Sequence, residues 1–160
     1  MKLSEHFTID ELTNTSHKDL ILVNKTRASG YEKVLKDLCT KILEPLRALI
    51  NKPIIINSGF RSKELNDRVK GSATSQHCFG EAVDIRVNGL KAEELFEIIK
   101  NNQQIFGDNL GQCILEKVGN SEWIHLSIKT ERYRNVLIQR YKSDEAVFLT
   151  TKDGKTYQRV

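Results

Sequence analysis

The sequence predicts an α+β domain in which helices flank a small antiparallel sheet. One long segment, residues 31–50, carries apolar residues at helical spacing. Two turn signals, Gly119-Asn120 and Asp153-Gly154, each separate runs that alternate as β-strands do. Helical and strand segments follow one another without a regular βαβ order, and this favours antiparallel over parallel pairing.

The segment 31–50 is the expected core helix. Its apolar residues recur at steps of three and four and form one stripe. They are Tyr31, Val34, Leu35, Leu38, Ile42, Leu46, Leu49 and Ile50. Pro45 removes one backbone donor inside this stripe, so we expect the helix to bend or tighten there.

Four shorter helices are expected at residues 7–13, 63–70, 91–100 and 133–141. Thr8 and Ser62 precede the first two as N-caps, because their hydroxyls can accept a hydrogen bond from a free backbone N–H. Gly71 is the expected end of the second helix. Residues 17–24 contain an apolar run that is too short to assign to a helix or a strand.

Six strands are expected at residues 53–57, 81–87, 112–118, 122–129, 146–150 and 155–159. The second of them alternates, so that Val83 and Ile85 share one face and Asp84 lies on the other. By the same rule His125 and Ser127 share a face of the fourth strand.

Length and composition are those of one globular domain. A chain of 160 residues can bury a sizeable core but is cramped for two domains. With 39% hydrophobic and 29% charged residues, it is neither disordered nor fibrous. We expect a single domain over residues 1–160, with its motif-bearing core at about 53–128 and an extension, 129–160, of unknown role.

Charge and cysteine content exclude some classes of protein. The net charge of +4 would favour an anionic polymer, but the basic residues are interleaved with acidic ones and lack a stripe of stacking aromatics. We therefore expect no nucleic-acid partner. Three cysteines without paired spacing argue against a disulfide framework and a thiolate metal cage, and Cys78 is expected to be a small buried filler.

No segment is expected to enter a membrane. The longest apolar runs are far too short to cross a bilayer, and the N-terminus becomes polar at once, without the core of a signal peptide. The sequence therefore predicts a protein that is made in the cytoplasm and either stays there or is carried out by something else. We expect it to be a monomer.

Two histidines and one aspartate form a candidate set of metal ligands. His77 and Asp84 lie seven positions apart around Gly80, and His125 lies in a later alternating run. Two neutral imidazole nitrogens and one carboxylate oxygen suit Zn²⁺ and leave a fourth position for water, as in catalytic zinc sites. The sequence thus predicts a zinc hydrolase built on these residues.

The motifs around them resemble the M15 family of zinc peptidases. The pattern Ser-x-His-x-x-Gly-x-Ala-x-Asp at 75–84 is followed by Glu-Trp-x-His at 122–125, and the turn at 58–62 looks like the family's arginine-bearing turn. The resemblance covers about residues 53–128. The family includes D-alanyl-D-alanine carboxypeptidases and peptidoglycan L,D- or D,D-endopeptidases, which implies a compact Hedgehog/DD-peptidase-like fold and one zinc ion.

Carried over by position, the resemblance also implies roles for single residues. The implied zinc ligands are His77, Asp84 and His125. Ser75 would contact substrate, and Arg61 would bind substrate or stabilise the oxyanion. Glu122 occupies the position of the general base.

Glu122 lies three residues before His125, so strict alternation would put the two side chains on opposite faces. Glu122 can reach the site only if the strand begins, bends or bulges there, and the preceding Gly119-Asn120-Ser121 allows this. Its rival is Glu116 on the partner strand, where a cross-strand neighbour could face His125. The resemblance favours Glu122, with Glu116 as the alternative.

The expected function is hydrolysis of stem or cross-bridge peptides of peptidoglycan, by a carboxypeptidase or an endopeptidase. Many phage lysins of the family are short and lack a signal peptide, so this chain would act on the cell wall after its release. The alternative is a non-catalytic module that keeps the fold and binds the wall or a partner protein. The complete ligand set and the available carboxylate argue against that alternative.

Overall fold

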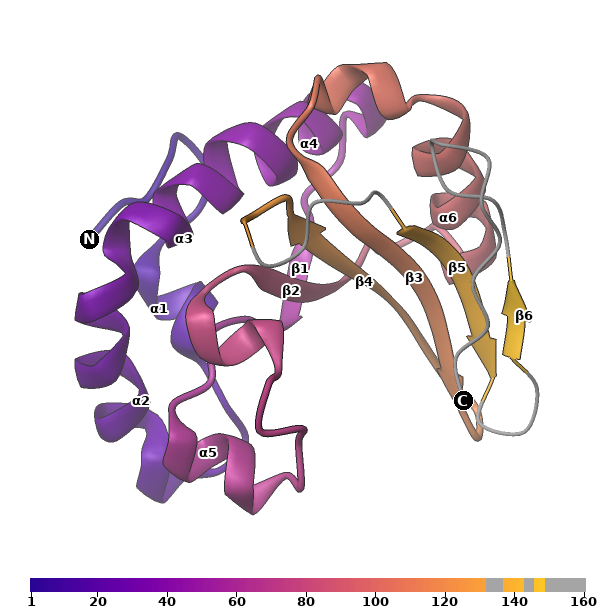
Figure 1. The fold of residues 1–160 in the computed structure, drawn as a ribbon. Coiled ribbons are helices and arrows are strands. Elements are labelled where there is room, and N and C mark those ends of the chain that lie inside the picture. Colours follow the sequence, from indigo (N-terminus) through magenta and orange to yellow (C-terminus); the bar gives the residue numbers. More distant parts are fainter. Residues whose placement is uncertain (132–136, 143–145, 149–160) are drawn as a thin grey trace.

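The computed structural model describes residues 1–131, 137–142 and 146–148. A twisted sheet crosses the molecule, with the α3–α4 helix and α6 beside it and a lobe with α2 and α5 at the other side (Figure 1). The strands lie in the order β1-β2-β4-β3-β5-β6. Their bounds are Ile55–Ser58 (β1), Ala82–Arg86 (β2), Leu110–Val118 (β3), Ser121–Ile128 (β4), Leu137–Lys142 (β5) and Ala146–Phe148 (β6).

The pairing of the strands confirms the α+β prediction. Strands β1, β2, β4 and β3 form an antiparallel sheet, and β5 then pairs parallel to β3. The hairpin predicted at Gly119-Asn120 joins β3 to β4. The second hairpin signal, at Asp153-Gly154, and the strand expected at 155–159 lie outside the described residues.

The two helices with a predicted N-cap, α1 and α5, begin directly after it. The helices are α1 (Ile9–Thr13), α2 (Ile21–Ala28), α3 (Glu32–Leu38), α4 (Glu44–Ile50), α5 (Lys63–Arg68) and α6 (Ala92–Asn101). Thr8 caps α1 in a reciprocal capping box with Glu11. The Ser62 hydroxyl accepts a hydrogen bond of 3.2 Å from the Leu65 amide at the start of α5.

The long core helix is continuous but contains one widened turn. Between α3 and α4 the five residues Cys39–Leu43 form a π-helical turn, in which the Glu44 amide donates to the Cys39 carbonyl. Pro45, which has no N–H, follows directly at the start of α4. The predicted irregularity is confirmed, but the helix widens at this turn instead of tightening.

Residues 17–24, which the sequence left unassigned, contribute to α2. The apolar run at their centre continues into Ile21–Ala28, and the helix contains a buried Asn24. The Asn24 amide nitrogen donates to the carbonyls of Thr13 and Phe60, and its side-chain oxygen accepts from the Ser62 amide at 2.7 Å. One side chain on α2 therefore fixes the backbone of the Phe60–Ser62 turn.

The helix predicted at 133–141 is wrong for the residues that the structure describes. Residues 137–142 form β5, paired with β3, while 132–136 lie outside the described part. Without β5, the edge of β3 would expose unpaired N–H and C=O groups. A neighbouring segment can form hydrogen bonds with these groups by becoming a strand. Sequence periodicity does not reveal this tertiary partner.

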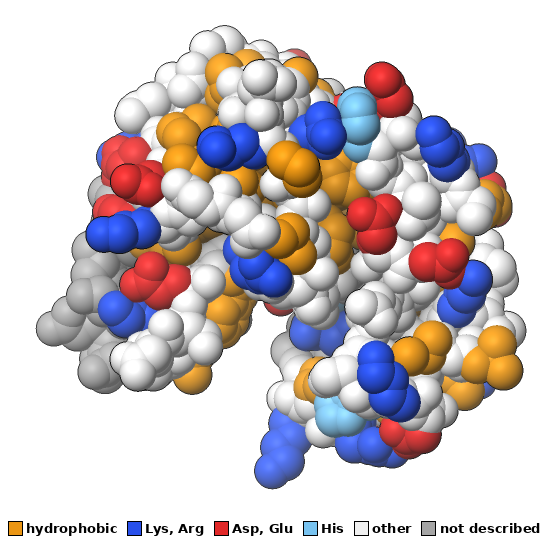
Figure 2. Space-filling view, turned by 180° about the vertical axis from the view of Figure 1, so that it is seen from behind, with side chains coloured by type: hydrophobic (Ala, Val, Ile, Leu, Met, Phe, Trp, Pro, Cys, Tyr) orange, Lys and Arg blue, Asp and Glu red, His pale blue; other side chains and the backbone are white. Residues whose placement is uncertain are grey.

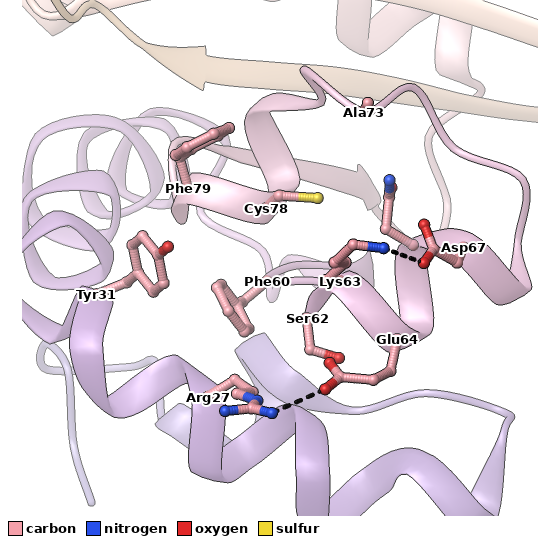
Figure 3. Close-up of a pocket in the computed structure, with 11 residues that line it drawn as sticks. Arg27, Tyr31, Phe60, Ser62, Lys63, Glu64, Asp67, Ala73, Cys78 and Phe79 are labelled. Carbon is pink, nitrogen blue, oxygen red and sulfur yellow. Dashed lines mark hydrogen bonds and ion pairs between the residues drawn. The ribbon is translucent and has the colours of Figure 1, made fainter.

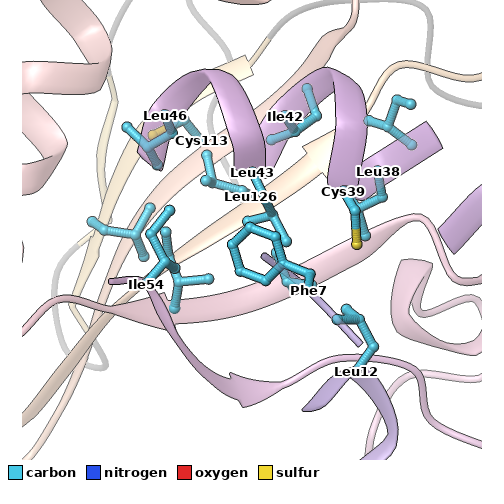
Figure 4. Packing of buried hydrophobic residues seen from close by; sticks show 14 of the residues in the cluster. Phe7, Leu12, Leu38, Cys39, Ile42, Leu43, Leu46, Ile54, Cys113 and Leu126 are labelled. Atoms are coloured by element: carbon cyan, nitrogen blue, oxygen red, sulfur yellow. The ribbon is translucent and has the colours of Figure 1, made fainter. Parts of the chain in front are cut away.

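The core lies between the sheet and the long helix. Leu38, Ile42 and Leu46 from the helix pack against Cys113 and Leu126 from the sheet (Figure 4). Because side chains alternate along a strand, burying Leu126 on this face places its neighbours in β4 on the other face. Within the described residues, no helix has the length and apolar character needed to cross a membrane.

Candidate metal centre

Three predicted ligand residues come together on the face of the sheet opposite the core helix. His77 lies in the short η4 turn (Gln76–Phe79), Asp84 in β2 and His125 in β4. Asp84 and His125 are paired directly in the β2–β4 ladder. One candidate ligand atom from each of the three residues lies within 4.8 Å of the others.

His77 is oriented by the backbone. Its Nδ1 lies 2.8 Å from the carbonyl oxygen of Gly59, which can only accept, so Nδ1 carries the proton. Nε2 therefore presents its lone pair, and this atom lies 3.4 Å from Asp84 Oδ1. After the turn, Gly80 at φ 68° reverses the chain into β2, a conformation that favours glycine.

His125 lies between two oxygen atoms. Its Nδ1 is 3.0 Å from Asp84 Oδ1, and its Nε2 is 3.0 Å from the Gln76 side-chain oxygen. The rings of His77 and His125 meet edge to face, with centroids 5.2 Å apart. Both imidazoles thus direct one nitrogen towards the same carboxylate.

The Asp84 carboxylate is the anionic member of the cluster. Its side chain is only 15% exposed, and burial alone would raise its pKa. When the two imidazoles are protonated, the charge of His77 and the hydrogen bonds from both rings outweigh that burial and hold the pKa of Asp84 well below its usual range. Asp84 therefore remains a carboxylate throughout the pH range in which proteins usually function.

The donor set fits Zn²⁺. Imidazole nitrogen and carboxylate oxygen are ordinary zinc ligands, and three protein ligands are typical of catalytic zinc sites. The Gly59 carbonyl on His77 and the Gln76 oxygen on His125 are outer contacts of the type that orient metal-binding imidazoles. A metal ion bound here would replace the contact between His125 Nδ1 and Asp84 Oδ1, whereas the Gly59 and Gln76 contacts of the two imidazoles would remain.

Arg61 lies beside the turn that carries His77. Its backbone amide donates to the His77 carbonyl at 3.0 Å, and its guanidinium donates to the Ser75 hydroxyl at 2.9 Å. Its Nε is buried and has no hydrogen-bond partner within the described residues. The two expected substrate contacts, Arg61 and Ser75, therefore bind each other, and the Arg61 backbone contacts the turn that carries His77.

Glu122 is not part of the cluster. The β3–β4 register runs without a shift from Cys113–Leu126 to Val118–Ser121, so no bend or bulge turns Glu122 towards His125. Its exposed carboxylate instead pairs with Lys117 at 3.1 Å. The local irregularity that the sequence allowed at this position is absent, and strict alternation places Glu122 on the opposite face.

Glu116 lies on the face that carries His125. It pairs directly with Trp123, and Ile114 on the same strand pairs with His125. Directly paired residues share a face, so Glu116 is the diagonal neighbour of His125. Its side chain is half-buried. Of the two glutamates weighed from the sequence, only Glu116 has a position on the face of the metal cluster.

The surface is deeply hollowed between the sheet and the lobe that carries α2 and α5 (Figure 2). A pocket in that lobe is lined by Tyr31, Phe60 and Phe79, with ion pairs of α5 at its rim (Figure 3). The Cys78 sulfur projects into this pocket, so Cys78 is a pocket-lining residue and the prediction of a buried filler is wrong.

Two contacts at the cluster were not predicted from the sequence. The Gly59 carbonyl is a backbone group, which leaves no side-chain signal apart from the glycine itself. Gln76 precedes His77 in the motif, and its amide could have been noted as a hydrogen-bonding group. Its reach to His125, 49 positions away, depends on the packing of η4 against β4.

An α+β fold with two imidazoles and a carboxylate gathered on one sheet face defines the class of candidate mononuclear metallohydrolases. The chain belongs to the Peptidase M15 family, whose sequence model matches residues 5–127. It is therefore a peptidase of a family of zinc peptidases. The match covers more than three quarters of the chain and extends the resemblance, which the motifs limited to about 53–128, to the N-terminal helices. Among curated proteins, a search found no match.

Proposed function

We propose that the chain is a zinc-dependent peptidase that hydrolyses peptide bonds in peptidoglycan, with His77, Asp84 and His125 as the metal ligands. The observation that carries the proposal is the convergence of these three side chains within 4.8 Å. Each imidazole already has an outer hydrogen-bond partner, which is the arrangement a metal-binding histidine requires.

Zinc held by these residues would supply Lewis acidity and lower the pKa of a bound water to about 7. Glu116, on the face of His125, is the residue we assign as general base. Its carboxylate would accept a proton from the attacking water and deliver it to the departing amine. We assign this role to Glu116 instead of Glu122, because Glu122 pairs with Lys117 on the other face.

Arg61 would act on the substrate. A guanidinium next to the metal cluster can stabilise the negative charge that develops on a carbonyl oxygen, or hold a terminal carboxylate through two parallel hydrogen bonds. The bond to the Ser75 hydroxyl restrains the guanidinium, and Ser75 offers a second polar contact for the substrate.

The family match and the net charge of +4 support a peptidoglycan substrate. Peptides of the wall carry free carboxylates, and a basic protein is attracted to an anionic polymer. We propose that the protein acts on the wall after release from the cell that makes it, in the manner of a phage lysin. Carboxypeptidase and endopeptidase action would differ in the bond that is cleaved.

The test is digestion of purified muropeptides, followed by mass spectrometry of the products and by metal analysis of the protein. The expected result is one zinc per chain and a peptide product that disappears with a chelator and returns with added zinc. The mass lost identifies the bond. The variant His125→Ala should lose both zinc and product, whereas His17→Ala, outside the cluster, should retain both. A protein without stoichiometric zinc and without product would refute the proposal.

A further inference from the structure

The position of the proton on His125 determines which of its two nitrogens can bind the metal. Nδ1 lies on the Asp84 side and Nε2 on the Gln76 side, each 3.0 Å from an oxygen. A neutral imidazole that binds metal through Nδ1 carries its proton on Nε2, and that proton needs an acceptor in a buried site. The Gln76 side-chain oxygen is the acceptor at this position.

An amide can offer its oxygen or its nitrogen, so its orientation must itself be fixed. The Gln76 nitrogen donates to the hydroxyl oxygen of Ser127 at 3.2 Å. The same oxygen accepts a hydrogen bond of 2.8 Å from the backbone amide of Gln112. Both lone pairs of the Ser127 hydroxyl are therefore occupied by N–H groups. A reversed Gln76 amide would place its NH₂ against the N–H of His125 and lose this contact.

The Gln112 amide is available because the β3–β4 ladder is irregular at this place. The register shifts between Leu110 and Cys113, which marks a β-bulge. At the bulge, a Cβ on Gly111 would lie 2.8 Å from both the Ile128 carbonyl oxygen and the Ser127 hydroxyl oxygen. Only glycine allows this close approach, so the bulge and the Ser127 contact depend on one residue.

The side chains that form these hydrogen bonds are buried. Gln76 is 6% exposed and Ser127 is fully buried. In such a place each polar group requires its specific partner, because water does not replace a lost one. The orientation of His125 is thus set by a series of hydrogen bonds. It starts at the bulge and passes through Ser127 and Gln76 to the imidazole.

We propose that Gln76 is a positioning residue, which Ser127 and the bulge at Gly111 hold in the one orientation that presents His125 Nδ1 to the metal. This inference rests on the proposed zinc site. The competing explanation is that Gln76 merely ties η4 to β4, in which case removing its side chain would affect folding but not the imidazole.

The two explanations differ in what a carboxylate does at position 76. Gln76→Glu keeps an oxygen acceptor for His125 Nε2, and the Ser127 hydroxyl can rotate to donate to it. Gln76→Leu keeps the approximate size and removes the acceptor. Gln104→Leu, at an exposed position away from the cluster, is the matched control.

Zinc affinity is measured by competition with a chromophoric chelator, and the melting temperature of each metal-free variant reports its folding. We expect Gln76→Leu to bind zinc about 10- to 100-fold more weakly, as for other outer contacts of metal-binding histidines. Gln76→Glu should bind zinc more tightly than Gln76→Leu, since its acceptor is retained. Ser127→Ala should weaken binding less, and adding it to Gln76→Leu should cause little further loss, because both act through one series of hydrogen bonds.

Unchanged zinc affinity in a folded Gln76→Leu variant would overturn this inference and leave the zinc site intact. Equal losses in Gln76→Leu and Gln76→Glu would also overturn it, because they would show that position 76 matters only for packing. A wild-type protein that takes up no zinc would overturn the proposed function and this inference together.

Discussion

The Nδ1 atom of His77 lies 2.8 Å from the carbonyl oxygen of Gly59, and this contact fixes the imidazole with Nε2 towards Asp84. Gly59 follows β1 directly, and the next amide, that of Phe60, donates to the carbonyl of Leu12 at the end of α1. The first helix therefore holds the backbone that orients a candidate metal ligand. This helix lies within the family match, which begins at residue 5.

The first prediction concerns this contact. A Cβ on Gly59 would collide with the backbone carbonyl of Leu12, so Gly59→Ala must displace the turn or α1. We expect a loss of about 1–3 kcal/mol in the free energy of unfolding and weaker zinc binding, because the His77 acceptor moves. Gly30→Ala is the control, since a Cβ there meets nothing within 4 Å. Denaturant unfolding and chelator competition measure the two effects. An unaltered zinc affinity in Gly59→Ala would contradict the role given to the Gly59 carbonyl.

The second prediction concerns pH. The pKa of Asp84 lies well below its usual range, so acidification to pH 5 leaves this carboxylate charged. Zinc binds only the neutral imidazole, so protons compete with zinc at His77 and His125, and zinc affinity should fall as the pH is lowered from 8 to 5. Asp84→Asn should weaken zinc binding strongly at neutral pH, because it removes the one anionic ligand of the set. Zinc titrations between pH 5 and 8 test this. A loss of zinc that begins only below about pH 4 would assign the competition to a carboxylate instead.

The third prediction separates the two glutamates. Glu116→Gln should lower kcat by about 10²- to 10⁴-fold with zinc still bound, because a positioned general base contributes an effect of that size. Glu122→Gln should leave kcat near the wild-type value, since its partner is Lys117 on the opposite face. Kinetics on a defined muropeptide, with metal analysis of each variant, decide between them. If Glu122→Gln alone abolishes turnover, the strand must rearrange when substrate or metal binds.

The fourth prediction concerns Arg61. Arg61→Ala should lower kcat by about 10²- to 10³-fold if the guanidinium stabilises the oxyanion. An increase in KM alone would indicate that it binds a terminal carboxylate in the ground state. Arg61→Lys should recover little activity, because an ammonium cannot form the two-pronged contact. Arg68→Lys serves as the control, since Arg68 is exposed and pairs with Asp19.

Local signals predicted much of the fold. The caps at Thr8 and Ser62 and the Gly119-Asn120 turn involve groups only a few residues apart, so the sequence contains all that determines them. The helix α2 and the strand β5 depend on partners distant in the chain. Asn24 is buried through contacts with Thr13 and Phe60, and β5 forms along the edge of β3. No short window of sequence contains those partners.

In the candidate site, too, the sequence predicted what depends on residue type and local spacing but not what depends on distant partners. His77, Asp84 and His125 were selected because their residue types and motif spacing suit a metal, and the structure brings them together. Glu122 was favoured by the resemblance, while the face it occupies depends on the register of the β3–β4 ladder. The orienting partners Gly59 and Gln76 act through a backbone oxygen and an amide, which have no distinctive sequence pattern.

The π-helical turn at Cys39–Leu43 has a consequence for comparing this chain with others. A π-helical turn contains one residue more than the corresponding turn of an α-helix, so it is equivalent to a single-residue insertion. A relative with an unbroken helix should align with a one-position gap here. Deleting one residue from this turn could restore ordinary α geometry and leave Leu35 and Leu46 facing the sheet. A deletion elsewhere in the same helix would rotate one half by about 100° and carry its apolar stripe away from the core.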